Sequence, residues 1–203
     1  MNAFLEAMHF AHACKVFDPA REIAKRDFDE ILEAGRLSPS SFGLEHTKLL
    51  VVQSQEVKES LKPLCWNQEQ ITTCSHLVVL KSRVESIKAP SDYILDSMAR
   101  RGRGMEYMQR LQGFQERNFT SQADYEAWSM KQAYIVASSM VNCAAFMRID
   151  SCYLEGFERQ KVEEFLQIDT KEERVALLLA FGYRIQEQKP KVRQSLAQLV
   201  EYL

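Results

Sequence analysis

The sequence predicts a single domain in which helices alternate with a few short strands. Its 203 residues suffice for one substantial core and are too few for two comfortable ones. Segments with helical spacing of apolar residues alternate with short apolar runs, which favours one mixed domain. The chain contains neither an internal repeat nor a low-complexity linker. We therefore expect one domain over residues 1–203.

Four short apolar runs predict strands, at residues 48–53, 75–81, 151–154 and 175–183. The second run is apolar at successive positions, so we expect it in the centre of a sheet, covered on both faces. Helical spacing predicts helices at 2–10 and 25–37, one through Val57, Leu61 and Leu64, a charged helical stretch over 90–117, and the longest helix over 124–148.

Two helical segments carry apolar side chains that another surface must cover. From Ala133 onward the longest helix is apolar or small nearly all round, so we expect it to be buried on every side. A subunit interface and a central position in a monomer both satisfy this requirement. The tail 189–203 has an apolar stripe at helical spacing, which fits either its own domain or a partner.

Composition excludes several classes of protein. A formal charge of −2 argues against a general nucleic-acid binder. Residues 1–10 lack a signal-peptide pattern, and the longest apolar segment, 133–147, is shorter than a membrane span. We expect a cytoplasmic protein without a membrane or nucleic-acid partner. Five cysteines without a Cys-x-x-Cys pair predict buried thiols, and their spacing to the histidines predicts no metal site.

The most informative stretch is Ser38-Pro39-Ser40-Ser41-Phe42-Gly43-Leu44, between a predicted helix and a predicted strand. A turn of this composition offers hydroxyls and free backbone N–H groups to a polar, planar ligand. Taken alone, this stretch is also consistent with a turn that only connects the helix to the strand.

Four further segments occur in the same order as motifs of a known family. They are His12-Ala13-Cys14-Lys15-Val16-Phe17, Asn67-Gln68-Glu69-Gln70 with the run 75–80 after it, Leu154-Glu155-Gly156-Phe157, and Lys191-Val192-Arg193. Together with the turn they resemble the nitroreductase family, whose members use flavin mononucleotide (FMN) and take electrons from NADH or NADPH. The resemblance implies an α+β fold with a central, mostly antiparallel sheet flanked by helices. It also implies an intertwined homodimer, with the tail 189–203 packing on the partner subunit.

The resemblance assigns a role to each segment. Lys15 would be the cation at the N1/C2-oxygen edge of the flavin, and Glu155 and Gly156 would lie near N5, where hydride arrives; these three are the catalytic candidates. The other cofactor-binding candidates are His12, Ala13, Ser38, Pro39, Ser40, Ser41, Gly43, Asn67, Gln70, Lys191 and Arg193. His12, Lys191 and Arg193 would contact the phosphate. The i, i+3 spacing of Asn67 and Gln70 predicts that both lie on one face of a helix.

The chain departs from the family pattern at two places. Ala11 stands where arginine is usual and Ala13 where serine is usual, and Glu45-His46-Thr47 replaces a common glutamine, proline and tryptophan. The expected function is transfer of hydride from NAD(P)H through flavin to a nitro or quinone acceptor. Donor and acceptor would use the same pocket one after the other, in a ping-pong mechanism. Alternatives are another flavin chemistry such as flavin fragmentation, and a flavin-binding or sensing protein with little turnover.

Several residues allow two interpretations. Cys14 is either a buried, inert thiol or, beside Lys15 and His12, one with a lowered pKa. The stretch 100–103 is either a solvated helix end or a border of the substrate entrance. Phe114, Phe119 and Trp128 are either core residues or part of an active-site wall.

Overall fold

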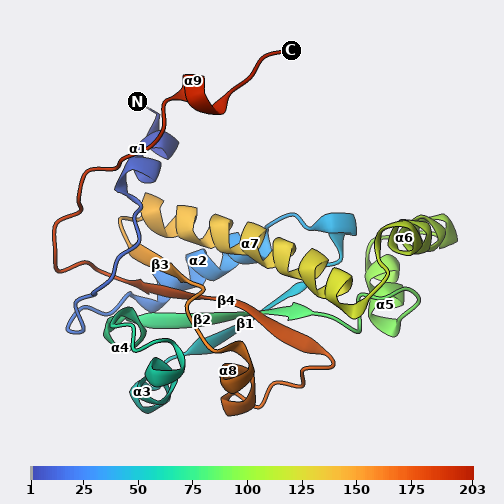
Figure 1. Cartoon of the computed structure of the whole chain (residues 1–203), viewed down its shortest axis with the longest axis horizontal. Helices are drawn as coiled ribbons and strands as arrows, with labels where there is room; N and C mark the ends of the chain where they lie inside the picture. Colours follow the sequence, from blue (N-terminus) through green and yellow to red (C-terminus); the bar gives the residue numbers. More distant parts are fainter. Residues whose placement is uncertain (1) are drawn as a thin grey trace.

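The fold is a four-stranded antiparallel sheet with helices on both faces, as described for residues 2–203 by a computed structural model (Figure 1). The strands are β1 (Thr47–Val52), β2 (His76–Arg83), β3 (Asp150–Leu154) and β4 (Glu173–Gly182), in the order β1-β2-β4-β3. The helices are α1 (Ala3–Phe10), α2 (Lys25–Arg36), α3 (Gln55–Leu64), α4 (Gln70–Thr73), α5 (Asp92–Arg100), α6 (Met105–Asn118), α7 (Gln122–Phe146), α8 (Arg159–Phe165) and α9 (Leu196–Leu199). This architecture confirms the α+β class and all four predicted strands.

The two central strands are buried on both faces because their side chains alternate between two layers of helices. Val78 and Leu80 of β2 pack with α2 and α7, whereas Leu77 and Val79 pack with α3, α4 and α8. Figure 1 shows α7 lying along one face of the sheet and α3 and α8 on the other. A third cluster joins α5, α6 and the start of α7. The central position expected for the run 75–81 is therefore confirmed.

The stretch 90–117 forms two helices. Gly102 has φ +60°, and Gly104 precedes the first residue of α6, so the chain turns between α5 and α6. Helical spacing of apolar residues continues across this break, which is why the sequence pattern alone did not locate it.

The expectation that the longest helix is buried on every side is wrong within one chain. In α7, Tyr134 is 38%, Ile135 40% and Phe146 49% exposed. The opposite side of the helix, which includes Ala133 and Ala137, is buried against the sheet. An apolar side of α7 thus remains uncovered by the chain's own residues 2–203.

The tail also leaves its apolar side chains uncovered. Helix α9 is short, and Val192, Leu196 and Leu199 are 86%, 77% and 61% exposed. The tail runs beside α1, where the Lys191 ammonium donates to the Met8 carbonyl oxygen and Gln188 Nε2 donates to the His9 carbonyl oxygen at 3.2 Å. None of the helices between residues 2 and 203 is long and apolar enough to cross a membrane.

Candidate functional site

Lys15 and Gln70 come from distant parts of the sequence and meet at the Cys152 sulfur. The segment around Lys15 runs beside β3, where Cys14 N donates to the Ser151 carbonyl oxygen at 3.0 Å. Lys15 Nζ lies 3.7 Å, and Gln70 Nε2 3.8 Å, from Cys152 Sγ. The structure therefore brings two of the predicted site segments together, side by side at β3.

The predicted loop at Glu155 and Gly156 joins this cluster through Gln68. Gln68 Nε2 donates to the Gly156 carbonyl oxygen at 2.8 Å, and Gln70 Nε2 donates to Gln68 Oε1 at 2.9 Å. A Cβ at position 156 would approach Trp66 Cε3 to 2.6 Å, so the close packing of position 156 against the Trp66 ring requires glycine. Three of the five predicted segments thus form one continuous polar cluster.

The helix face expected for Asn67 and Gln70 is not formed. Asn67 has φ +54° and lies, exposed, in the turn before α4, which begins at Gln70. Gln70 is buried at the first position of that helix. The two amides are near in sequence but belong to different local structures, and only Gln70 bonds to the cluster around Cys152.

A cavity of 520 Å³ next to Lys15 is rich in basic side chains. Its lining includes His12, Lys15, Arg184, Lys191 and Arg193. Arg193 Nη1 donates to the Val192 carbonyl oxygen at 2.8 Å. The cavity brings His12 and Lys15 together with the predicted basic pair of the tail, and it adds Arg184. Such a set of donors suits an anionic group.

Asp150 partly neutralises this cavity. Its carboxylate pairs with Arg184 Nη2 at 2.5 Å and lies 3.5 Å from His12 Nδ1. Burial, together with Arg184, lowers the pKa of His12 despite the attraction of Asp150. His12 is thus less readily protonated than an ordinary histidine, and Lys191 and Arg193 are the stronger anion-binding groups.

Cys14 fits the interpretation of a buried, inert thiol. Burial raises its pKa to about 11, and the nearby Asp150 carboxylate acts in the same direction. The thiol is therefore protonated near neutral pH and is not an activated nucleophile. Phe114, Phe119 and Trp128 pack against one another in the cluster of α5, α6 and α7, as expected for core residues.

The turn over residues 38–43 lies apart from the other segments. Figure 1 shows it near α5 and the first half of α7, whereas the segment around Lys15 lies beside β3 and α4. The free N–H groups expected of this turn are largely used: Ser41 N donates to Gln132 Oε1 at 2.9 Å, Gly43 N to the Ser40 carbonyl oxygen at 2.8 Å and Glu45 N to Ser40 Oγ at 2.9 Å. Ser38 Oγ bonds to the Ala34 carbonyl oxygen at 3.1 Å. Within one chain, the turn and Lys15 therefore do not share a site.

The sequence does not identify as site residues those side chains that reach the cluster and the cavity only through tertiary contacts. Gln68 lies inside the motif Asn67-Gln68-Glu69-Gln70, and its place in that motif could have indicated a role. Cys152, Asp150 and Arg184 carry no such signal in the sequence. Tyr134 of α7 was also missed; its hydroxyl donates to Glu155 Oε1, and burial together with this carboxylate raises the pKa of Tyr134 to about 12. Among residues 2–203, no three His, Cys, Asp or Glu side chains are grouped to hold a metal ion.

Comparison with known proteins decides the family. Residues 10–183 match the model of the Nitroreductase family. The chain belongs to the nitroreductase family. It is 38% identical to a Staphylococcus epidermidis protein named "Putative NAD(P)H nitroreductase", over 100% of this chain and 97% of the relative. A similarly named Staphylococcus aureus protein is 37% identical, with 100% and 96% covered.

Solved structures show the same fold. A nitroreductase-like protein from Streptococcus mutans aligns with a TM-score of 0.86 at 20% identity and covers 100% of this chain and 99% of its own. A "putative nitroreductase in complex with FMN" from Exiguobacterium sibiricum aligns with a TM-score of 0.83 at 21% identity, with 100% and 98% covered. The nitroreductase-like α+β fold implied by the sequence motifs is thereby confirmed.

Proposed function

We propose that this protein is an FMN-dependent oxidoreductase that passes hydride from NADH or NADPH to a nitro or quinone acceptor, by turns in one pocket. The observation that carries the proposal is the polar cluster that links Lys15, Gln70 and Gly156, through Cys152 and Gln68, beside a basic cavity of 520 Å³. The names of the curated relatives and the FMN complex of a structural neighbour support the same cofactor and electron donors.

The residues around the cavity fit FMN. Lys191 and Arg193 would hold the phosphate, with His12 as a weaker third contact and Ala13 in the adjacent wall. Gly156 packs so closely against Trp66 that a side chain at this position would displace the Trp66 ring. Gln70 and Asn67 carry amides that both donate and accept, as the pyrimidine edge of a flavin requires. When bound, FMN would supply reversible acceptance and donation of hydride.

The chain's own residues would orient and tune that chemistry. Lys15 would hold positive charge against the ring edge where negative charge develops on reduction. Gln68 fixes the amide of Gln70 and the carbonyl of Gly156, so the polar edge of the site is organised in advance. Glu155, bonded by Tyr134, would border the position from which hydride approaches.

A homodimer would supply the missing part of the site. Tyr134, Ile135 and Phe146 leave an apolar side of α7 exposed, and the tail exposes further apolar residues. A second copy covering these surfaces would carry its own turn, with Ser38, Pro39, Ser40, Ser41 and Gly43, to the ring bound by the first. In this arrangement each cofactor is held by two chains, in the cytoplasm, where the nicotinamide donors are present.

The test is the visible absorbance spectrum of the purified protein, followed by NADPH and NADH oxidation with a nitroaromatic or a quinone. The proposal predicts flavin bands and acceptor-dependent oxidation. Absence of flavin bands, before and after incubation with FMN, would contradict it.

A flavin-binding protein with little turnover is the second candidate. It is favoured by Ala11, which lacks the usual arginine, and by the pairing of Arg184 with Asp150. Flavin bands without NAD(P)H oxidation by any acceptor would select this function.

A further inference from the structure

The turn between α2 and β1 has a backbone that needs support from outside itself. Phe42, Gly43 and Glu45 have φ values of 54°, 62° and 52°, in the left-handed region that disfavours residues other than glycine. Such conformations persist where the surrounding structure holds them, and they gather at ligand sites.

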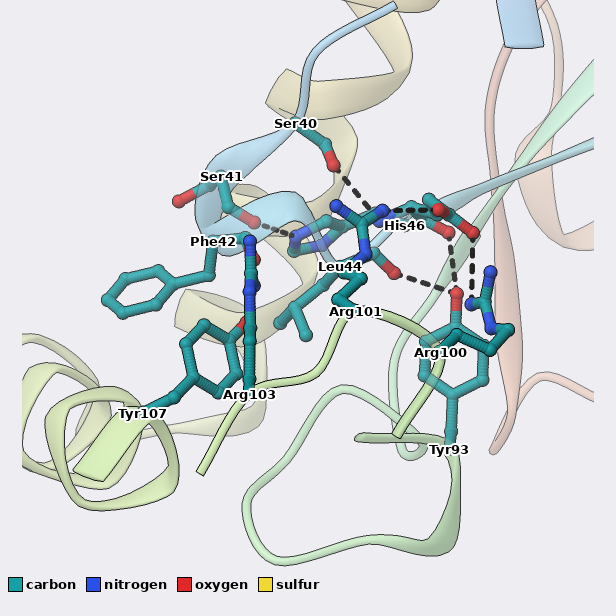
Figure 2. A network of polar contacts seen from close by, with 11 residues as sticks. Ser40, Ser41, Phe42, Leu44, His46, Tyr93, Arg100, Arg101, Arg103 and Tyr107 are labelled. Carbon is teal, nitrogen blue, oxygen red and sulfur yellow. Dashed lines mark hydrogen bonds and ion pairs between the residues drawn. The ribbon is translucent and has the colours of Figure 1, made fainter. Parts of the chain in front are cut away.

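Two side chains from the α5–α6 region hold the Phe42 carbonyl oxygen. Arg103 Nη1 donates to it at 2.7 Å and the Tyr107 hydroxyl at 2.6 Å (Figure 2). The Arg103 guanidinium also lies over the Tyr107 ring, 4.3 Å from its centroid. The two donors therefore support each other and converge on a residue with positive φ.

Neighbouring contacts extend this support along the turn. The Tyr93 hydroxyl lies 2.7 Å from the Leu44 carbonyl oxygen and 3.0 Å from that of Glu45. Arg100 and Arg101 both pair with the Glu45 carboxylate. Side chains from α5, from α6 and from the loop between them thus hold the turn at Phe42, Leu44 and Glu45.

Arg103 differs from its two neighbouring arginines. Among residues 2–203 it forms no ion pair with a carboxylate, and its charge is directed at a backbone carbonyl. Arg101 lies close to Gly43 as well, since a Cβ on Gly43 would approach Arg101 Nη1 to 2.7 Å. The arginines thus cover one side of the turn, and the φ of +62° at position 43 favours glycine.

We propose that Arg103 and Tyr107 are positioning residues for the cofactor: by fixing the Phe42 carbonyl they set how the turn over residues 38–43 meets FMN bound by a second copy. This inference rests on the proposed function. The sequence allows two interpretations of the stretch 100–103, a solvated helix end or a border of the substrate entrance. This inference instead gives Arg103 a specific role at the turn.

The test compares Arg103→Gln, Tyr107→Phe and the double variant with a matched control, Arg110→Gln. Arg110 lies on α6, as Tyr107 does, and it lines the same cavity as Arg103 and Tyr107. FMN affinity is measured by titrating the apo-protein, and amide hydrogen exchange of Gly43 and Leu44 is measured without FMN. Arg103→Lys serves as the conservative variant, which keeps the charge and loses the planar fork.

We expect the double variant to bind FMN about tenfold more weakly, a change of about 1.4 kcal/mol. Exchange at Gly43 and Leu44 should be faster, while exchange in β2 stays at the wild-type rate. Arg103→Lys should recover part of the affinity, and Arg110→Gln should behave as wild type. Tyr107→Phe, which keeps the ring, carries the test by itself if the double variant does not fold.

Unchanged FMN affinity in folded variants would overturn the inference, whether or not the amides exchange faster. An equal loss in Arg110→Gln would overturn it too, because the effect would then follow the loss of charge alone. Failure of the proposed function is seen in a different protein, namely wild type that binds no FMN.

Discussion

At the scale of single residues, Lys15 joins the sequence motif to the geometry of the site. Its ammonium lies beside Cys152 and Gln70, at the edge of the basic cavity. The motif predicted this residue, but it did not reveal Cys152 as the point where the segments meet. That contact joins positions 137 residues apart, and short-range patterns contain no such information.

Lys15→Ala should lower the reduction potential of bound FMN, because a fixed cation stabilises the negative charge gained on reduction. A hydrogen bond to a charged group contributes roughly 1.5–3 kcal/mol. For a two-electron couple this corresponds to about 30–60 mV. The potential is measured by dye-coupled reduction, with Lys171→Ala, an exposed lysine elsewhere, as control. An unchanged potential in Lys15→Ala would remove Lys15 from the mechanism.

His46 should make the fold sensitive to acid. Burial lowers its pKa to about 4, with Arg83 acting in the same direction and a bond to the Ser41 carbonyl oxygen opposing them. Below pH 6.5 His46 binds a proton in the unfolded chain but stays neutral in the native state. The free energy of unfolding therefore falls as pH drops from 6.5 towards 4. The loss attributable to His46 is about 3 kcal/mol over this window.

Urea unfolding of wild type and His46→Gln at pH 7 and pH 4.5 checks this expectation. Carboxylates titrate in both proteins, so the comparison isolates His46. The wild type should lose more stability than the variant between the two pH values. Equal losses would show that His46 is not held neutral in the native state.

Ala11→Arg should tighten FMN binding about tenfold, because it restores a charge-assisted donor worth roughly 1.5–3 kcal/mol. Arg184, whose Nη2 donates to the Phe10 carbonyl oxygen at 3.3 Å, lies close by but is paired with Asp150. We therefore expect protein purified without added FMN to be partly empty. Titration of the apo-protein, with Ala20→Arg as a control for added charge, measures the change. Stoichiometric FMN in wild type, unaffected by Ala11→Arg, would contradict this prediction.

At the scale of elements, the sequence predicts whether a segment forms a helix or a strand better than it predicts where a helix breaks or a turn begins. The strands were found because runs such as 75–81 and 175–183 are apolar at consecutive positions, as burial on both faces demands. The break between α5 and α6 was missed because helical spacing continues through it. The i, i+3 spacing of Asn67 and Gln70 predicts one helix face, but the positive φ of Asn67 puts it in a turn.

The site was predictable as a set of segments but not as a geometry. Order and spacing of short motifs predict Lys15, Gln70 and Gly156 as site residues, and the structure links them through Cys152 and Gln68. The state of the turn N–H groups, by contrast, depends on Gln132 of α7, a residue 91 positions away from Ser41. Whether a donor is free is a tertiary property, so composition alone overestimated what the turn can offer.

Deletion of the tail 189–203 should remove FMN and the dimer together. The tail carries Lys191 and Arg193 into the basic cavity, and its apolar side chains are exposed in a single chain. Replacing Leu196 and Leu199 by serine separates the two effects, because it keeps both basic residues and should weaken the dimer first. Sedimentation velocity monitored at a flavin wavelength checks both results. A folded, flavin-loaded monomer of the full-length protein would contradict the account of assembly.

At the scale of the whole molecule, the two proposed halves of the site lie at separate places in one chain. The cluster around Lys15 lies beside β3, while the turn lies near α5 and is tied to the α5–α6 loop. Two copies that exchange these halves would create two equivalent sites per dimer, which is the ordinary outcome of twofold symmetry. The exposed apolar side of α7 is the surface on which such an exchange would rest.

Mixing two defective chains tests whether each site is built from two chains. One chain carries Lys15→Glu and the other Ser41→Glu; in a mixed dimer one site contains both changes and the other contains neither. The measurement is the FMN content, after saturation with added FMN, of mixed dimers isolated by two different affinity tags after co-expression. We expect no FMN in either parent dimer and one FMN per mixed dimer. A mixed dimer as empty as its parents, or a Ser41→Glu dimer with wild-type FMN content, would contradict a site built from two chains.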